Sequence, residues 1–299
     1  MSASGGEAAR AAVARLTGRD VLRARPLGAV TRCTLDDGTE VIAKTGDPTA
    51  VAAEAAGLRW LAVAEGPGVP TLLGVEESWL VSEAVGEGSA GEGSAGEGSA
   101  GTDAAETFGR RLAALHATGA PAFGAPPPGG PADAWIGGAP MRNDPAPAGT
   151  RWIDWYVEAR VLPYVRLAVD RGGMSTSQAA QIEDGCRRLT GGDVDVGPEE
   201  RPGRLHGDLW TGNVLWGSGG AWVIDPAAHG GHRETDLAML ALFGCPRLDT
   251  VLAAYDEAAP LADGRRDRIA LHQLFPLLVH AALFGGGYGS SACERMSSL

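Results

Sequence analysis

The 299-residue sequence has almost no lysine. Of its 25 basic residues, 24 are arginine and only Lys44 is a lysine. Lysine is normally among the commoner residues, and at a site shaped for a compact ammonium group arginine does not replace it. The single lysine therefore makes position 44 a candidate functional position.

Cysteine and long apolar runs are scarce as well. The four cysteines are widely spaced and form no CxxC pair, which argues against a disulfide framework or a zinc ribbon and fits a reducing compartment. The N-terminus lacks the apolar run of a signal peptide. No stretch reaches 18 uninterrupted apolar residues, so no membrane segment is expected. We predict a soluble, cytoplasmic protein.

Basic residues are also outnumbered. The 25 basic residues face 37 acidic ones, the net charge is −12 and the isoelectric point is about 4.9. This balance argues against nucleic acid or an anionic membrane surface as a partner. A hydrophobic content of 44% with 21% charged residues is ordinary for a globular protein. The length allows one large or two medium domains.

The first 86 residues predict a small antiparallel sheet with a single helix packed against it. The turn signal Asp36-Asp37-Gly38 separates two alternating segments, and Thr49 is a candidate cap for the Ala-rich helix. We expect a short helix at 7–17, strands at 21–27, 29–35, 39–45, 71–76 and 78–84, and a helix at 49–64. Lys44 falls near the end of the third strand.

A low-complexity tract divides the chain. Residues 87–101 repeat EGSAG three times and contain no apolar side chain beyond alanine, so the tract is predicted to be a linker or loop. We therefore predict an N-terminal lobe over 1–86 and a C-terminal lobe over 102–299.

Helices dominate the C-terminal lobe. Asp103 and Glu106 predict a capping box, Pro163 predicts a kink in a helix over 151–171, and 119–150 is expected to be an irregular surface excursion. The aromatic group Trp152, Trp155 and Tyr156 is interpreted as packing. Further helices are predicted at 177–190, 234–243, 249–258 and 265–284, the last ended by Gly285–Gly287. The fold class is thus α+β, with a sheet-rich lobe and a larger helical lobe.

The informative motif is HxDxxxxN over His206, Asp208 and Asn213, followed 12 residues later by Asp225 behind apolar residues. Phosphoryl transfer needs one carboxylate to accept the proton of an attacking hydroxyl. It also needs an amide oxygen and a second carboxylate to hold Mg²⁺ on the nucleotide phosphates. Asp208, Asn213 and Asp225 supply these groups.

Kinase chemistry further requires a lysine on the third strand and a helix glutamate that orients it. Lys44 and Glu54 meet this requirement, ten residues apart on a strand and the following helix. The lone lysine and the motif therefore point to the same site.

The segments HGDLWTGNVLW, IDPAAHGGHRETDLAML and LFGGGYG resemble the fructosamine kinase (ketosamine 3-kinase) family. That family belongs to the wider aminoglycoside-phosphotransferase and protein-kinase-like fold. The resemblance implies an ATP- and Mg²⁺-dependent kinase that phosphorylates the 3-hydroxyl of a ketosamine, either free or protein-bound, as a deglycation step. A monomer is expected.

The same resemblance implies roles at the centre of the cleft. Asp208 would be the proton acceptor, Asn213 and Asp225 would hold Mg²⁺, and Lys44, paired with Glu54, would contact the phosphates.

It implies peripheral roles too. Backbone groups of Glu83 and Val85 would read the adenine edge. The segment around Gly28 would lie over the phosphates, although it has a single glycine and is a few residues shorter than the loop of the family. Further residues are assigned to the substrate pocket or to support of the catalytic loop: Trp210 and His232 to the first, His206 and Asp236 to the second.

Three alternatives remain. His206, Asp208, Asp225, His229 and His232 are also compatible with a metal-hydrolase cluster, which leaves Asn213 and Lys44 unexplained. The same fold also serves aminoglycoside-type phosphotransferases. The glycine-poor phosphate loop is compatible with a nucleotide-binding regulator that has lost catalysis.

Overall fold

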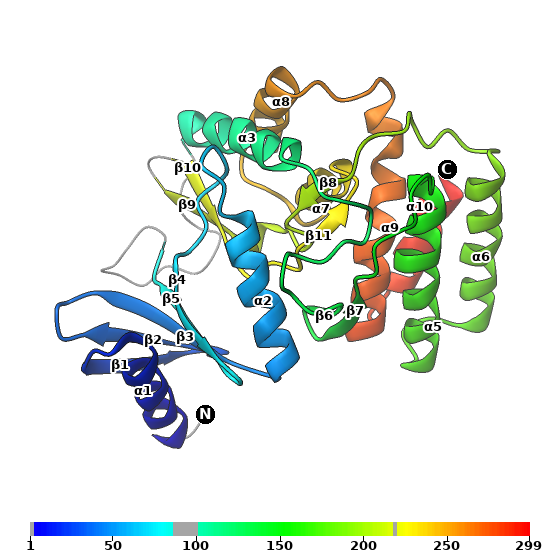
Figure 1. Cartoon of the computed structure of the whole chain (residues 1–299). Coiled ribbons are helices and arrows are strands. Elements are labelled where there is room, and N and C mark those ends of the chain that lie inside the picture. Colours follow the sequence, from blue (N-terminus) through cyan, green and yellow to red (C-terminus); the bar gives the residue numbers. More distant parts are fainter. Residues whose placement is uncertain (1–2, 86–100, 218–219) are drawn as a thin grey trace.

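The computed structural model describes residues 3–85, 101–217 and 220–299, so most of the EGSAG tract lies outside the described residues. A five-stranded antiparallel sheet lies at one end of the molecule and most helices lie at the other (Figure 1). This arrangement confirms the predicted α+β class.

The sheet is built from the first 83 residues. Its strand order is β1-β2-β3-β5-β4. Its elements are α1 (Ala3–Thr17), β1 (Val21–Leu27), β2 (Val30–Leu35), β3 (Glu40–Thr45), α2 (Pro48–Leu61), β4 (Leu72–Glu76) and β5 (Trp79–Glu83). All five predicted strands are confirmed within two residues at each end.

Two helices cover the sheet, not one as predicted. Val81 of β5 belongs to the apolar cluster that includes α1, whereas Leu80 packs with α2. Because successive strand residues point to opposite faces, the two helices lie on opposite faces. The cap of α2 also differs from the prediction: Asp47 accepts hydrogen bonds from the backbone N–H groups of Thr49 and Ala50, since its carboxylate precedes Pro48.

The larger part of the chain is mainly helical. Its helices are α3 (Thr102–Ala117), α4 (Trp152–Tyr156), α5 (Leu162–Asp170), α6 (Thr176–Gly191), α7 (Glu234–Phe243), α8 (Leu248–Ala258), α9 (Arg265–Phe284) and α10 (Tyr288–Ser297). Short strands pair as β6 (Asp133–Ile136) with β7 (Ala139–Arg142), β8 (Gly203–Leu205) with β11 (His229–Gly231), and β9 (Val214–Gly217) with β10 (Gly220–Val223).

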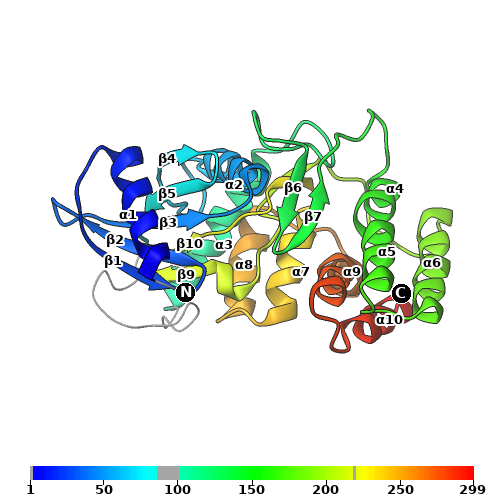
Figure 2. The same cartoon turned by 90° about the horizontal axis from the view of Figure 1, so that it is seen from below.

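Three local predictions in this part need correction. Gly101, not Asp103, is the N-cap of α3, and it makes no side-chain capping bond. The segment 119–150 contains the β6–β7 hairpin. β6 packs against α2 and β7 contacts α9 (Figure 2). Helix α10 had no counterpart among the predicted helices, because three of its ten residues are serine, which has a low helix propensity, and a glycine run precedes it.

The expected break near Pro163 takes the form of a π-helical turn over Val157–Val161 between α4 and α5. A π-turn is a common way to accommodate an interruption of the helical hydrogen bonds. The aromatic residues before it are buried, as predicted. Among the described residues, no helix is long and apolar enough to cross a membrane.

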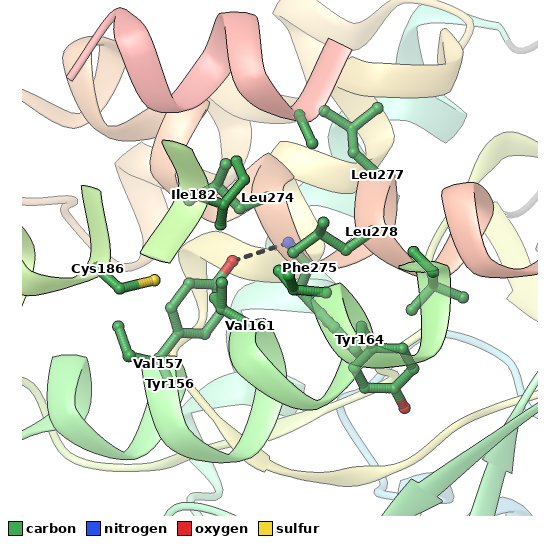
Figure 3. Close-up of a cluster of buried hydrophobic side chains, with 14 of the residues drawn as sticks. Tyr156, Val157, Val161, Tyr164, Ile182, Cys186, Leu274, Phe275, Leu277 and Leu278 are labelled. Carbon is green, nitrogen blue, oxygen red and sulfur yellow. Dashed lines mark hydrogen bonds between the residues drawn. The ribbon is translucent and has the colours of Figure 1, made fainter. Parts of the chain in front are cut away.

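The Tyr156 hydroxyl ties α4 to α9 in the core (Figure 3). It donates to the carbonyl of Leu271 (2.9 Å) and accepts from the N–H of Phe275 (3.1 Å). These two backbone groups are four residues apart and would normally bond each other. Pro276 follows directly inside α9, and the hydroxyl compensates for the disturbed hydrogen-bond ladder.

We expect Tyr156→Phe to lower the free energy of unfolding by about 1–3 kcal/mol, because two buried backbone groups lose their partner. Urea denaturation measures the change. Tyr164→Phe is the matched control, since the Tyr164 hydroxyl donates to the carbonyl of Pro140 (2.8 Å) and bridges no pair of backbone groups in the described part of the chain. Equal losses in the two variants would contradict the bridging role.

Candidate active site

Lys44 links three distant parts of the chain. Its ammonium nitrogen lies 2.7 Å from the Glu54 carboxylate of α2 and 3.2 Å from the Asp225 carboxylate that follows β10. Lys44 points to the sheet face that α2 covers, because it alternates with the buried Ala43 on β3. The predicted Lys44–Glu54 pair is present, and Asp225 joins it across the cleft.

The charges at this centre stabilise one another. Burial alone would lower the pKa of Lys44, but Glu54 and Asp225 together raise it above its usual value. Burial raises the pKa of the Glu54 carboxyl, and Lys44 opposes that shift. Lys44 therefore stays protonated, as a group that contacts phosphates must be.

Asp208 and Asn213 lie in one loop between β8 and β9. The amide nitrogen of Asn213 donates to the backbone carbonyl of Asp208 (2.8 Å) and to its carboxylate (3.2 Å). This leaves the amide oxygen of Asn213 as its remaining ligand atom. The two side chains are thus fixed relative to each other, with four residues between them in a single loop.

Burial raises the pKa of the Asp208 carboxyl to about 7, with smaller contributions from Asp225 and Asp236 and opposition from Asn213 and Lys44. A carboxyl that titrates near neutral pH can both take up and release a proton under physiological conditions. Such a pKa is suited to a general base.

Asp236 of α7 holds the start of the loop that carries Asp208 and Asn213. Its carboxylate accepts from the backbone N–H groups of His206 (2.8 Å) and Gly207 (3.0 Å) and contacts His116 of α3 (3.1 Å). His116 in turn contacts the hydroxyl of Tyr255 (2.8 Å). Burial alone would raise the pKa of Asp236, but His116 and the loop contacts lower it. The loop therefore rests on a buried, ionised carboxylate.

His206 supports the same loop rather than facing solvent. Its ring is fully buried; Nε2 contacts the carbonyl of Ile224 (2.9 Å) and Nδ1 accepts from the N–H of Asp208 (3.3 Å). Ile224 precedes Asp225, so His206 connects the two aspartates. Asp225 itself has a φ of 53°, the left-handed conformation that non-glycine residues rarely adopt and that often marks functional sites.

These groups line one cleft with a volume of about 390 Å³. Lys44, Glu54, Asp208, Asn213 and Asp225 all contribute to its surface. Trp210 lines it as well and is 40% exposed. Five of the predicted central residues and one predicted substrate residue are therefore brought together.

Other predicted residues lie outside the cleft lining. Gly28 forms the two-residue turn between β1 and β2, with a φ of 59°, so this hairpin has no long glycine-rich loop. The N–H of Glu83 donates to the carbonyl of Thr71 (2.9 Å), and its carbonyl accepts a long contact from the Ser82 hydroxyl (3.4 Å), which leaves one lone pair of that carbonyl for a ligand. Val85 is half-buried after β5.

His232 does not line the cleft either. It is buried against Trp152 and His272, at ring-centroid distances of 4.7 and 4.8 Å. With Glu234 and His272 it forms the one group of potential metal ligands found among the described residues. Arg268 donates to both oxygens of Glu234 (3.1 and 2.7 Å), so this carboxylate is already paired.

The metal-hydrolase alternative gains no support from this geometry. Nδ1 of His229 contacts the carbonyl of Ala227, and both nitrogens of His206 are engaged. The donors at the cleft fit Mg²⁺ instead. The Asp225 carboxylate and the amide oxygen of Asn213 are hard oxygen ligands of the kind that Mg²⁺ prefers, with room left for water and phosphate.

The sequence did not indicate several cleft residues. Trp135 on the β6–β7 hairpin and Phe284 at the end of α9 also line the cleft. Trp135 belongs to no motif, and Phe284 lies in the LFGGGYG segment, which was interpreted only as a mark of the family and a helix terminator. An exposed tryptophan in a Pro/Gly-rich stretch was the available signal for Trp135.

Comparison with known proteins places the chain in a family. The fructosamine kinase family model matches residues 38–299. Mouse ketosamine-3-kinase is 33% identical over 148 residues, covering 50% of this chain and 47% of the mouse protein. The probable ketoamine kinase YniA of Escherichia coli K12 is 33% identical over 149 residues, covering 50% of each chain. These alignments thus span about half the length of the curated relatives.

Solved structures extend the likeness to the whole chain. A candidate fructosamine-3-kinase from Thermobifida fusca is 43% identical, covers 97% of each chain and superposes with a TM-score of 0.85. The aminoglycoside phosphotransferase APH(2'')-Ib, solved with ADP, is 12% identical over 96% of each chain with a TM-score of 0.59, which shows the shared fold alone. From its match to the family model over residues 38–299, this chain belongs to the fructosamine kinase family.

Proposed function

We propose that the protein is an ATP-dependent kinase that phosphorylates the 3-hydroxyl of ketosamines. One observation carries the proposal: the half-buried carboxyl of Asp208, with its pKa raised to about 7, shares a cleft with the Lys44–Glu54–Asp225 ion-pair network, in a chain of the fructosamine kinase family.

Each of these residues has its own role in the proposed reaction. Asp208 accepts the proton of the attacking hydroxyl while a new O–P bond forms to the γ-phosphorus. The bond from the γ-phosphorus to the β,γ-bridging oxygen breaks, and ADP leaves. Lys44 neutralises phosphate charge, held by Glu54. Asn213 and Asp225 would hold Mg²⁺, which supplies further charge neutralisation when bound.

The peripheral assignments belong to the same proposal. The lobe over residues 1–86 would bind the nucleotide, with the carbonyl of Glu83 and the backbone of Val85 at the adenine edge and the Gly28 turn near the phosphates. The lobe over 102–299 would carry the acceptor site, with Trp210 beside the sugar. A ketosamine 3-phosphate is expected to shed its sugar, which makes the reaction a deglycation step. The monomeric state and cytoplasmic location stay predictions.

The pH dependence follows from Asp208. The base must be ionised, and its pKa is raised to about 7 by burial. We therefore expect kcat/KM to fall about tenfold per pH unit below pH 7 and to level off above it, because this parameter reports the free enzyme. Initial rates from pH 5 to 9 measure the profile. A profile that stays flat from pH 5 to 9 would contradict the raised pKa of the Asp208 carboxyl.

An ADP-release assay over a panel of acceptors tests the substrate class. Fructose and ribulose adducts of lysine should support turnover, whereas kanamycin should not. Turnover of kanamycin alone would favour an aminoglycoside-type enzyme. Calorimetric binding of Mg·ATP with no turnover of any acceptor would favour a nucleotide-binding regulator.

A further inference from the structure

Large exposed apolar side chains gather at the mouth of the cleft. The exposed large hydrophobic residues among the described part of the chain are Leu22, Leu27, Leu73, Trp135, Trp210 and Phe284. The three aromatic members all line the cleft, with exposed fractions of 37%, 40% and 66% for Trp135, Trp210 and Phe284. We call these three side chains the aromatic rim. Exposed apolar surface of this kind commonly marks a binding site.

The rim is carried by elements that touch each other. The turn of the β6–β7 hairpin packs on the end of α9: a Cβ at Gly137 or Gly138 would lie 3.5 Å from the methyl groups of Leu283. Trp135 lies two residues before this turn, and Phe284 directly follows Leu283. On its other side the hairpin meets α2 (Figure 2). Packing on both sides holds Trp135 at the cleft.

A row of ring contacts joins the outer rim to the catalytic loop. Phe284 contacts His280 (5.4 Å between ring centroids), His280 contacts Phe243 (4.6 Å), and Phe243 contacts Trp210 in an edge-on arrangement (6.4 Å). Trp210 is two residues beyond Asp208. These aromatic side chains therefore form a continuous row, called the aromatic wall below, from the loop of Asp208 to the mouth of the cleft.

The residues that line the cleft indicate which kind of ligand can bind along the aromatic wall. The lining contains three carboxylates, Glu54, Asp208 and Asp225, and one cation, Lys44, which is already paired. No arginine is among the described lining residues. Since the proposed reaction engages Glu54, Asp208 and Asp225 at its inner end, the aromatic faces set the preference at the mouth, and such faces favour a hydrocarbon chain next to a cationic amine.

We propose that Trp135 and Phe284 form the binding site for the amine-linked substituent of the acceptor, an alkyl chain such as that of a modified lysine. This inference rests on the proposed function, since the sugar hydroxyl at Asp208 sets the inner end of the substrate. The substituent then extends along the aromatic wall and covers the exposed faces of Trp135 and Phe284.

The test uses two fructose ketosamines that differ only in the amine, one made from methylamine and one from hexylamine. With the wild-type protein, KM for the hexyl adduct should be about tenfold lower, because the longer chain buries apolar surface on the rim. The double variant Trp135→Ala/Phe284→Ala should bring the ratio of the two KM values close to one. Trp135→Phe/Phe284→Leu should retain most of the ratio.

Leu73→Ala is the matched control, since Leu73 is equally exposed but lies on β4, away from the cleft lining; it should keep the wild-type ratio. Calorimetric binding of the two adducts, without ATP, separates the two proposals. Tighter binding of the hexyl adduct by the wild type than by the double variant, with no ADP release, would refute the kinase proposal and support the rim. Equal chain-length dependence in the wild type and the double variant would overturn the rim site, whatever the turnover.

Discussion

Asp208→Asn should lower kcat by about 10³-fold, within the range that general-base catalysis contributes. The amide cannot accept the hydroxyl proton, yet it keeps the size and one oxygen acceptor of the carboxyl. Asn213 can still donate to that oxygen, as it does at 3.2 Å in the native loop. Single-turnover measurement with saturating Mg·ATP isolates this loss from product release.

Folding should not suffer in this variant. Since the folded state raises the pKa of Asp208 from 3.8 to about 7, its ionised form destabilises the fold above pH 7 relative to pH 4. The neutral amide removes that cost, so the melting temperature at pH 8 should be equal or higher. Asp236→Asn is the contrasting control, because Asp236 accepts from two N–H groups and contacts His116; it should destabilise the protein. Wild-type kcat in Asp208→Asn would refute its role as the base.

Lys44→Arg should reduce kcat/KM for Mg·ATP by about 100-fold, the scale of losing one well-placed electrostatic contact. The substitution retains the positive charge, but it does not retain the geometry of the contacts with Glu54 and Asp225. Lys44 places a compact ammonium 2.7 Å from Glu54 and 3.2 Å from Asp225. A planar guanidinium is larger, prefers a bidentate contact with one carboxylate, and would displace Asp225 from its position in the cleft.

The reciprocal exchange at an exposed ion pair is the control. Arg187 pairs with Asp184 on the surface of α6 at 2.8 Å, with both side chains about two-thirds exposed. Arg187→Lys should leave the kinetics and the melting temperature unchanged, because such pairs contribute little. If Lys44→Arg turned over nucleotide as fast as the wild type, the ammonium geometry would be irrelevant to the reaction.

Local sequence signals were sufficient where a function depends on one short segment. Asp208 and Asn213 share a single loop, so their spacing already implies that their side chains meet. Lys44 and Glu54 follow each other on a strand and the next helix, and a covering helix must face the alternate residues of that strand. For Lys44 and Glu54, the sequence was enough to predict the contact, which the structure contains.

Long-range contacts were beyond such signals. The 3.2 Å contact of Lys44 with Asp225 joins residues 181 positions apart, and the contact of Asp236 with His116 crosses 120 positions. Local secondary-structure propensity does not indicate which distant segments contact each other in the folded protein. The motif nominated Asp225, and the family resemblance nominated Asp236, but the partners of each emerge only when the elements pack.

The tertiary structure also differs from two predictions made from the sequence. The segment 119–150 looked irregular because proline and glycine dominate it, yet its hairpin packs between α2 and α9. His232 looked like a pocket residue, yet it is buried against Trp152 and His272.

The sequence by itself determined the α+β class, and it predicted the HxDxxxxN motif and the lone lysine as parts of the site, because these depend on periodicity and short spacing. Only the packed structure decided the cleft wall, since exposure is a property of neighbours. Trp135 and Phe284 are ordinary apolar residues in the sequence, and they become a candidate binding surface only where the fold leaves their rings uncovered beside the catalytic loop.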